Sequence, residues 1–78
     1  MLRRIGFKSK MYPIPDDVKP KFELGTILLD ADVEEYSIIV DIYMDNSKRI
    51  IYVHRDLSDM TRDLHSTEFE ITEWFEIL

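Results

Sequence analysis

The chain contains no cysteine, only two glycines and three prolines, and fewer basic than acidic residues. Without cysteine, neither a disulfide framework nor a thiolate metal site can form, which fits a reducing compartment. No apolar run approaches the ~20 residues of a membrane helix. Arg3 and Arg4 are not followed by the apolar stretch of a signal peptide. We therefore expect a cytoplasmic protein without a membrane partner.

The remaining composition is that of a small acidic globular protein. Its 78 residues are enough for one domain, and a hydrophobic content of 45% is too high for disorder. The net charge of −6 is unevenly spread, with +4 in residues 1–21, −4 in residues 22–55 and −6 in residues 56–78. Such an acidic body repels nucleic acid, so a nucleic-acid ligand would have to bind the basic N-terminus.

We divide the chain into a basic, proline-containing N-terminal arm (residues 1–21) and a small β-barrel domain (residues 22–78). Pro13, Pro15 and Pro20 interrupt regular structure in the arm, because proline fixes φ and lacks a backbone donor. The arm is expected to be an extended lead-in that lies over the body, and not a helix.

The strongest structural signal is a hairpin over residues 36–55. Two runs rich in β-branched and aromatic residues flank the polar turn formed by residues 45–48. The alternation predicts a shared core with the inward residues Ile38, Val40, Ile42, Ile50 or Ile51, and Phe69. The alternative phase of the first strand places Ile39 and Tyr43 inside.

The flanking segments complete an all-β prediction. Gly25 is expected to have a positive φ before the first core strand. Residues 58–64 are predicted to form one helical turn, with Ser58 as its N-cap. Residues 68–72 are predicted as a strand with Phe69 and Ile71 inward, and residues 73–78 as a turn leading into a short final strand.

The order of these features resembles the SH3-like small β-barrels, including KOW and Tudor-like modules. Phe22, Gly25 and Ile27 match the opening of such a barrel, residues 36–55 its central hairpin and residues 71–78 its closing segment. The resemblance implies a five-stranded, partly open barrel with one short helical turn, here preceded by an N-terminal extension. Such barrels bind proline-rich peptides, methylated side chains, RNA, and ribosomal or polymerase proteins.

Three patterns suggest chemistry, and each is better explained as ordinary structure. Residues 54–57 match the start of a kinase catalytic loop, but the required asparagine is replaced by Thr61. Residues 30–35 lack the glycine of a calcium-binding loop. The histidines and carboxylates of a conceivable metal site are not at recurring spacings; they are His54, His65, Asp56, Asp59, Asp63 and Glu68. We predict no catalytic residue, metal or cofactor, and therefore no enzyme.

The working hypothesis is a non-catalytic, acidic protein-binding module. Its candidate partner-binding residues are acidic or aromatic: Tyr43, Glu68, Glu70, Glu73, Trp74 and Glu76. In so small a domain, however, a lone tryptophan is more often a core residue, and this favours the core for Trp74. In size and acidity the chain is similar to phage and mobile-element accessory proteins, many of which inhibit or redirect a host nucleic-acid enzyme.

Two other interpretations stay open. One is a nucleic-acid-binding module that uses the basic arm residues Arg3, Arg4, Lys8 and Lys10, which are interleaved with aromatic residues. The other is a subunit or homodimer assembled through a hydrophobic edge strand.

Overall fold

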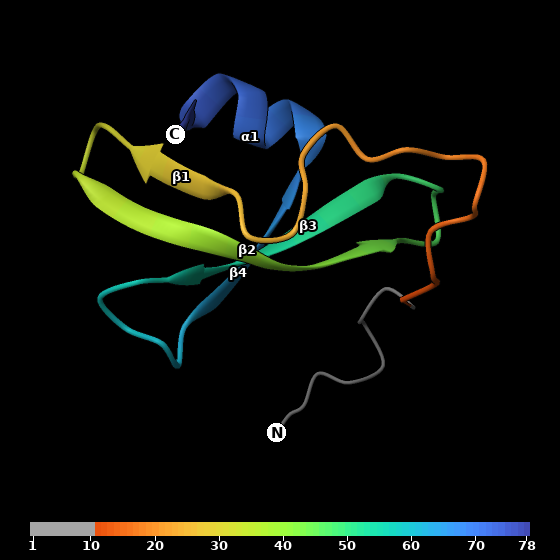
Figure 1. Ribbon diagram of the computed structural model, residues 1–78, viewed down its shortest axis with the longest axis horizontal. Helices are drawn as coiled ribbons and strands as arrows, with labels where there is room; N and C mark the ends of the chain where they lie inside the picture. Colours follow the sequence, from red (N-terminus) through yellow and green to blue (C-terminus); the bar gives the residue numbers. More distant parts are fainter. Residues whose placement is uncertain (1–10) are drawn as a thin grey trace.

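The computed structural model describes residues 11–78, which form one open antiparallel sheet of five strands and one short helix (Figure 1). The elements are β1 (Ile27–Asp30), β2 (Glu35–Met44), β3 (Ile50–Asp56), β4 (Asp63–Thr67), α1 (Glu68–Trp74) and β5 (Glu76–Ile77). The order across the sheet is β4-β3-β2-β1-β5. The prediction of an all-β, five-stranded, partly open barrel with one short helical segment is confirmed.

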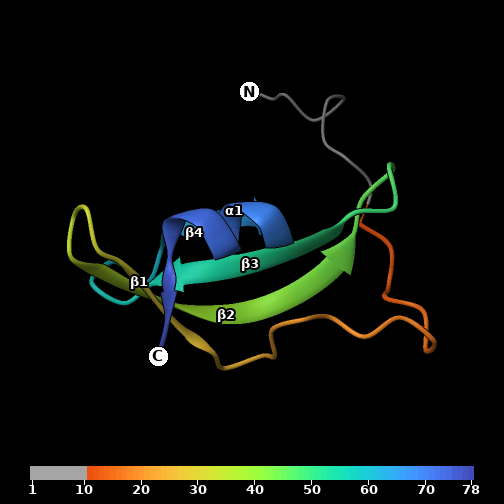
Figure 2. The ribbon, with the colours of Figure 1, turned by 90° about the horizontal axis from the view of Figure 1, so that it is seen from above.

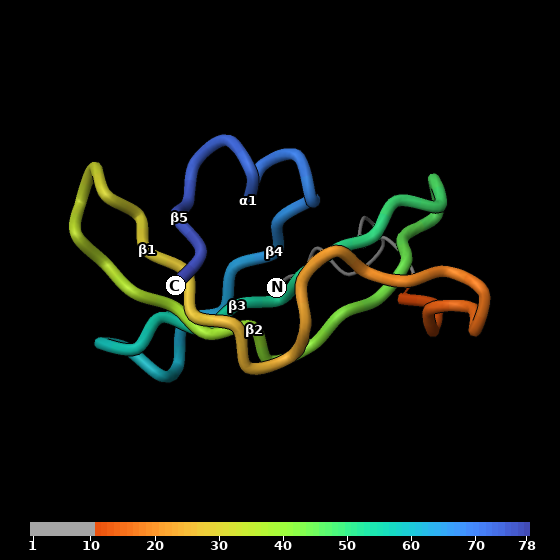
Figure 3. The backbone as a smooth tube through the Cα atoms, turned by 45° about the horizontal axis from the view of Figure 1, so that its top comes forward, coloured from red at the N-terminus to blue at the C-terminus, as the bar shows by residue number. Residues whose placement is uncertain are grey.

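The chain runs as a meander through the first four strands and then returns to the far edge of the sheet. After β4, α1 lies over one face of the sheet, as Figure 2 shows from above. The chain then pairs β5 with β1 through Leu28↔Ile77 and Leu29↔Glu76 (Figure 3). The helix therefore bridges the two edge strands, β4 and β5, and covers the face between them.

The turn between β2 and β3 is organised by Asp45. Its Oδ1 accepts hydrogen bonds from the backbone N–H groups of Ser47 and Arg49, both at 2.9 Å. The N–H of Arg49 is the largest of the influences that hold the pKa of Asp45 below its usual value. Lys48 takes the left-handed conformation, with φ of 64°, that closes the turn. The predicted hairpin around a short polar turn is confirmed.

The core lies between the sheet and α1. Its five buried side chains come from the arm junction, three strands and the helix: Phe22, Leu28, Ile39, Tyr52 and Ile71. The rings of Phe22 and Tyr52 meet edge to face, with 5.4 Å between their centroids. Ile42, Ile50 and Phe75 pack against this cluster at partial burial.

A β-bulge in β2 changes which residues face this core. The register with β3 shifts between Ile39 and Asp41, so that Val40 is an extra residue in the strand. Ile39 before the bulge and Ile42 after it therefore face the same side. The prediction that Ile38 and Val40 belong to the core is wrong, because both are half-buried whereas Ile39 is 1% exposed.

Residues 68–72, predicted as a strand, belong to α1. The Thr67 hydroxyl accepts from the N–H of Glu70 at 3.2 Å, and the Glu70 carboxylate accepts from the N–H of Thr67 at 2.8 Å. This reciprocal pair satisfies two donors and starts the helix. Ile71 is buried as predicted. Phe69 is 71% exposed, contrary to prediction, because alternate residues do not share one face of a helix.

The helical turn predicted for residues 58–64 is absent, and a tight turn joins β3 to β4 instead. Asp56 accepts from the N–H of Ser58 at 2.9 Å, and Asp59 accepts from the N–H of Thr61 at 3.1 Å. Such side-chain bonds compete with helix formation by capturing the same backbone donors.

Residues 11–21 form no helix, as predicted for this part of the arm, but they are not extended throughout. A turn at Asp16 and Asp17 is closed by a hydrogen bond from the Val18 N–H to the Pro15 carbonyl at 3.0 Å. Tyr12 and Met44 exchange two backbone hydrogen bonds of 2.9 Å, which fasten the arm to the end of β2. Gly25 has the expected positive φ, at 87°. The proposed division of the chain at residues 21 and 22 stays a prediction, and residues 1–10 lie outside the described part.

The face of the sheet opposite α1 carries a tyrosine–histidine pair. The hydroxyl of Tyr43 on β2 lies 3.0 Å from Nδ1 of His65 on β4. Because β3 runs between these strands, the pair crosses over Ile51 and Val53, which are 7% and 5% exposed. Strand β3 is thus covered on both faces.

Candidate functional site

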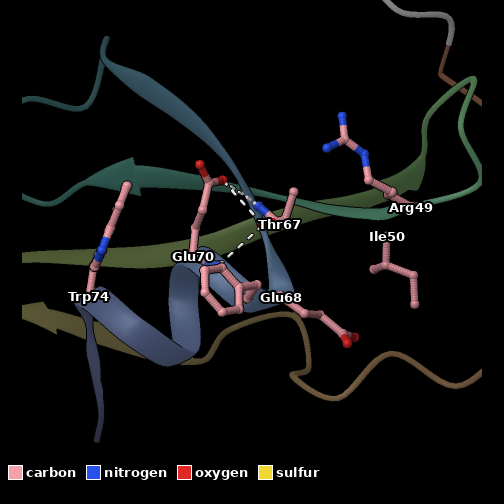
Figure 4. A pocket seen from close by; sticks show the side chains of 7 residues that line it. Arg49, Ile50, Thr67, Glu68, Glu70 and Trp74 are labelled. Atoms are coloured by element: carbon pink, nitrogen blue, oxygen red, sulfur yellow. Dashed lines mark hydrogen bonds between the residues drawn. The ribbon is translucent and has the colours of Figure 1, made fainter.

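A groove of about 570 Å³ lies between α1 and the end of the β2–β3 hairpin (Figure 4). Its lining residues are Arg49, Ile50, Thr67, Glu68, Phe69, Glu70 and Trp74. Figure 4 shows Trp74 at one end of the groove and Arg49 with Ile50 at the other. The groove therefore gathers three of the predicted partner-binding residues, Glu68, Glu70 and Trp74, in one place.

Two large aromatic side chains of α1 remain in solvent at this groove. Phe69 is 71% exposed and Trp74 is 63% exposed, while Ile71 between them is fully buried. The preference for Trp74 as a core residue is therefore wrong. Burying a large apolar side chain is favourable by about 1.5–3 kcal/mol, so leaving two exposed on one short helix forgoes stability. Exposed apolar side chains gathered in this way indicate a contact surface.

Glu68 and Glu70 have structural duties at the start of α1. Glu68 accepts hydrogen bonds from the Tyr52 hydroxyl at 2.5 Å and from the N–H of Lys21 at 3.1 Å. Glu70 completes the capping pair with Thr67. Acidic residues in the first helical turn also interact favourably with the helix dipole. These two carboxylates therefore fix the helix that presents the aromatic residues.

Within the described part of the chain, Glu73 and Glu76 do not take part in hydrogen bonds that hold α1 in place. Within residues 11–78, their carboxylates make no hydrogen bond or ion pair, and both residues are exposed. Glu73 lies in the last turn of α1, which contains no basic residue, and Glu76 follows the helix as the first residue of β5. A negative charge at a helix C-terminus is unfavourable by about 0.3–1 kcal/mol. Their presence is therefore not explained by the stability of the helix.

A second hollow adjoins the groove at Trp74. It measures about 230 Å³ and is lined by Ala31, Asp32, Glu73, Trp74, Phe75 and Glu76. Three of these residues are acidic, so the hollow is strongly negative. Trp74 lines both spaces and separates the aromatic groove from the acidic hollow.

The structure does not bring Tyr43 together with the other predicted partner-binding residues. Its ring packs against His65 on the face opposite α1. Burial, followed by the nearby charges of Asp45 and Asp41, raises the pKa of the Tyr43 hydroxyl. A role for Tyr43 in partner binding stays a prediction, as a separate surface from that of α1.

The one fully buried histidine of the described residues joins three strands. His54 lies with Nδ1 2.9 Å from the Ser37 hydroxyl and Nε2 2.9 Å from the Ser66 hydroxyl. Burial, and then the charge of His65, lowers the pKa of His54, so the ring is held neutral. A nucleophilic serine needs an accessible hydroxyl, but Ser37 is 5% exposed and His54 is 0% exposed. Ser66 is half-buried, but the imidazole that it contacts is fully buried, so the network joins three strands and is structural.

The other patterns weighed from the sequence have structural roles as well. Arg55 of the kinase-like stretch pairs with Asp63 at 2.8 Å, and Asp56 organises the β3–β4 turn. In the acidic stretch before β2, Asp30 accepts from the N–H of Asp32 at 3.2 Å. Within residues 11–78, no three potential metal-ligating side chains come together. Arg3, Arg4, Lys8 and Lys10 lie outside the described residues.

Comparisons with known proteins leave the chain without an assigned family. No protein family, curated protein or solved structure matches it. The resemblance to SH3-like barrels therefore stays a prediction about family, although the strand count agrees with it. None of the helices in residues 11–78 is both long and apolar enough to cross a membrane.

Sequence reasoning missed four residues of the groove: Arg49, Ile50, Thr67 and Phe69. Phe69 was hidden by the incorrect strand prediction. The pattern of Thr67 followed three residues later by Glu70 is a recognised helix-start signature, and it would have placed Phe69 on a helix surface. Arg49 and Ile50 join the groove only through the tertiary fold, and no local signal identifies them.

Proposed function

We propose that this chain is a non-catalytic protein-binding module, a small inhibitor or adaptor that acts on a larger, nucleic-acid-processing protein. The observation that carries the proposal is the outer surface of α1 and the start of β5. There Phe69 and Trp74 are exposed beside the carboxylates of Glu73 and Glu76, which have no partner among residues 11–78. Tryptophan is among the residue types enriched in binding hot spots.

The charge of the described residues supports a basic partner. The chain carries −6 overall, and residues 1–10 contain four basic and no acidic residues, so residues 11–78 carry −10. Proteins that process nucleic acids bind phosphate through basic surfaces. An acidic module is attracted to such a surface and repelled by nucleic acid itself. On this proposal, its carboxylates occupy positions on the partner that phosphates would otherwise take.

Two resemblances point in the same direction. Small acidic accessory proteins of phages and mobile elements are similar in size and charge, and many act on host nucleic-acid enzymes. SH3-like barrels frequently serve as protein-binding modules. Both are analogies in size, charge or fold class, which do not by themselves establish function, so the proposal rests on the α1 surface.

A capture experiment with matched charge variants tests the proposal. The immobilised full-length chain is exposed to nuclease-treated lysate, in wild-type form and with Glu73→Lys plus Glu76→Lys. Asp16→Lys plus Asp17→Lys is the control, because it changes the charge equally in an exposed loop at the other end of the molecule (Figure 1). We expect a protein retained by wild type and control to be lost from the α1 variant.

If nuclease treatment leaves no protein bound to the wild-type chain, the nucleic-acid-binding function of the N-terminal arm is favoured instead. In that case, neutralising Arg3, Arg4, Lys8 and Lys10 would abolish binding to a labelled oligonucleotide, and the α1 variant would bind as well as wild type or better. Phosphate contacts are strongest at low ionic strength, so the titration is done at ~50 mM salt. Absence of wild-type binding there would eliminate this alternative.

A further inference from the structure

We infer that the α1 surface takes a basic segment of its partner that also carries an apolar side chain, with Trp74 contacting both parts. The inference rests on the proposed function and specifies the chemistry that the site recognises. An apolar partner side chain would occupy the groove beside Ile50 and Phe69. A neighbouring lysine or arginine would enter the acidic hollow beside Glu73 and Glu76.

The aromatic groove and the acidic hollow lie next to each other, so one partner segment can contact both. Trp74 lines the aromatic groove and the acidic hollow at once, and it is 63% exposed. A lysine or arginine side chain consists of an apolar stem and a cationic head. The stem and head match an aromatic ring flanked by carboxylates, since a cation is attracted both to the face of tryptophan and to the carboxylate oxygens.

The negative charge around the hollow determines where a cationic side chain of the partner would bind. The hollow is lined by Asp32, Glu73 and Glu76, and the C-terminal end of α1 adds partial negative charge from its free carbonyl groups. The basic residue of the groove, Arg49, lies at its far end and is already paired with Asp45 at 2.9 Å. A cationic segment is therefore favoured at the Trp74 end of the site.

The same charges disfavour the other occupants. In a second copy of the chain, residues 11–78 again carry a net charge of −10, so this acidic surface would repel it. Nucleic acid would bring phosphates against the same carboxylates. A purely apolar segment would fill the groove but leave the acidic hollow without a counter-charge. A basic segment with an apolar side chain uses both spaces.

Trp74 provides the readout, because it is the only tryptophan of the chain. The full-length protein is titrated with a short synthetic peptide that contains leucine and arginine, while tryptophan emission is followed. Two matched peptides replace arginine with glutamate, or leucine with serine. We expect the leucine–arginine peptide to shift emission to shorter wavelength, and each replacement to weaken binding by about tenfold or more.

Two protein variants test the two halves of the site. Glu73→Gln with Glu76→Gln should weaken binding of the leucine–arginine peptide by about tenfold and reduce its salt dependence. Phe69→Ser should weaken binding without changing the salt dependence. Asp16→Asn with Asp17→Asn is the control and should bind as wild type does. The thermal transition of each variant is compared with that of wild type to show that the variant is folded. If a variant does not fold, the salt dependence of peptide binding by the wild-type protein tests whether binding depends on charge.

Several outcomes would overturn the inference. These are no wild-type response to the leucine–arginine peptide, equal response to the glutamate peptide, or wild-type binding that ignores salt. A Trp74 emission that changes on dilution without peptide would identify a second copy as the occupant. If neutralising Arg3, Arg4, Lys8 and Lys10 shifts the emission without peptide, the occupant is the N-terminal segment of the chain itself. A partner captured through α1 that the peptide does not displace would leave the proposed function intact and overturn only this inference.

Discussion

The hydroxyl of Tyr52 donates a 2.5 Å hydrogen bond to the carboxylate of Glu68, and this bond joins β3 to the start of α1. The same hydroxyl accepts from the backbone N–H groups of Lys21 and Phe22, at 2.9 Å and 3.3 Å. One side chain of β3 thus holds together the arm junction, the sheet and the helix that presents the candidate site.

Removing the Tyr52 hydroxyl should therefore be costly although the ring remains. In Tyr52→Phe, a carboxylate and two N–H groups lose a shared partner, and we expect the free energy of unfolding to fall by about 1–3 kcal/mol. Tyr36→Phe is the matched control, because Tyr36 is 46% exposed, and it should be nearly neutral. Urea denaturation measures both. Equal midpoints for the two variants would contradict a central role for Tyr52.

Alkaline pH should weaken the fold through the same residue. Burial, and then the hydrogen bond with Glu68, raises the pKa of Tyr52 to about 12. The ordinary value is about 10, so the folded chain holds this proton more tightly than the unfolded chain. The contribution of protonated Tyr52 to the free energy of unfolding is fully present below about pH 10 and is lost as the pH rises towards about 12. Urea midpoints across this window should fall less steeply in Tyr52→Phe, and an unchanged slope would refute the assignment.

Mild acid should weaken the fold through His54. Burial lowers the pKa of His54, so the unfolded chain takes up a proton at a higher pH than the folded chain. Stability from this residue is present above about pH 6.5 and is lost as the pH falls below it. Carboxylates with lowered pKa, such as Asp45, lose their contribution only near about pH 4 and below.

A pair of histidine variants separates this effect from the others. His54→Gln should reduce the dependence of the urea midpoint on pH between about 7 and about 5, whereas His65→Gln should retain most of it. Exposed His65 differs from His54 in its burial, which is the property under test. A slope unchanged by His54→Gln would show that other groups control acid stability.

The bulge in β2 makes a prediction about core substitutions. Ile39→Ala should cost about 2–5 kcal/mol, because the side chain is 1% exposed and packs in the main cluster. Val40→Ala should cost clearly less, since Val40 is half-buried at the extra position of the bulge. Chemical denaturation of both variants ranks them. A larger loss for Val40→Ala would place the bulge elsewhere in the strand.

The hairpin was predictable because its signals are local. Alternation with a period of two, and an aspartate that can cap its own turn, are both visible in residues 36–55. The phase of β2 was not predictable, because residues 38–40 and Ile42 are all apolar and fit either face. Only pairing with β3 fixes the position of the extra residue.

The helix and the site show the same division between local and tertiary information. Residues 68–72 alternate between acidic or polar and apolar types, which fits a strand, and the capping signal that distinguishes a helix was overlooked. Glu70, Glu73, Trp74 and Glu76 are predicted as binding residues from their acidic or aromatic type, which is visible in the sequence. Ile50 approaches them only when β3 and α1 pack together, and Tyr43 is directed to the other face by its register.

The pairing of Leu28 with Ile77 has a consequence for the order in which the molecule assembles. The β2–β3 hairpin needs only local loop closure, whereas β5 must find β1 from the opposite end of the described chain. We expect the hairpin to form early and the β1–β5 pair late, so that substitutions in β5 accelerate unfolding more than they slow folding. Because α1 lies between β4 and β5, the surface that carries Trp74 is completed in this last step. Local opening of the C-terminal segment would then remove that surface while the hairpin stays folded.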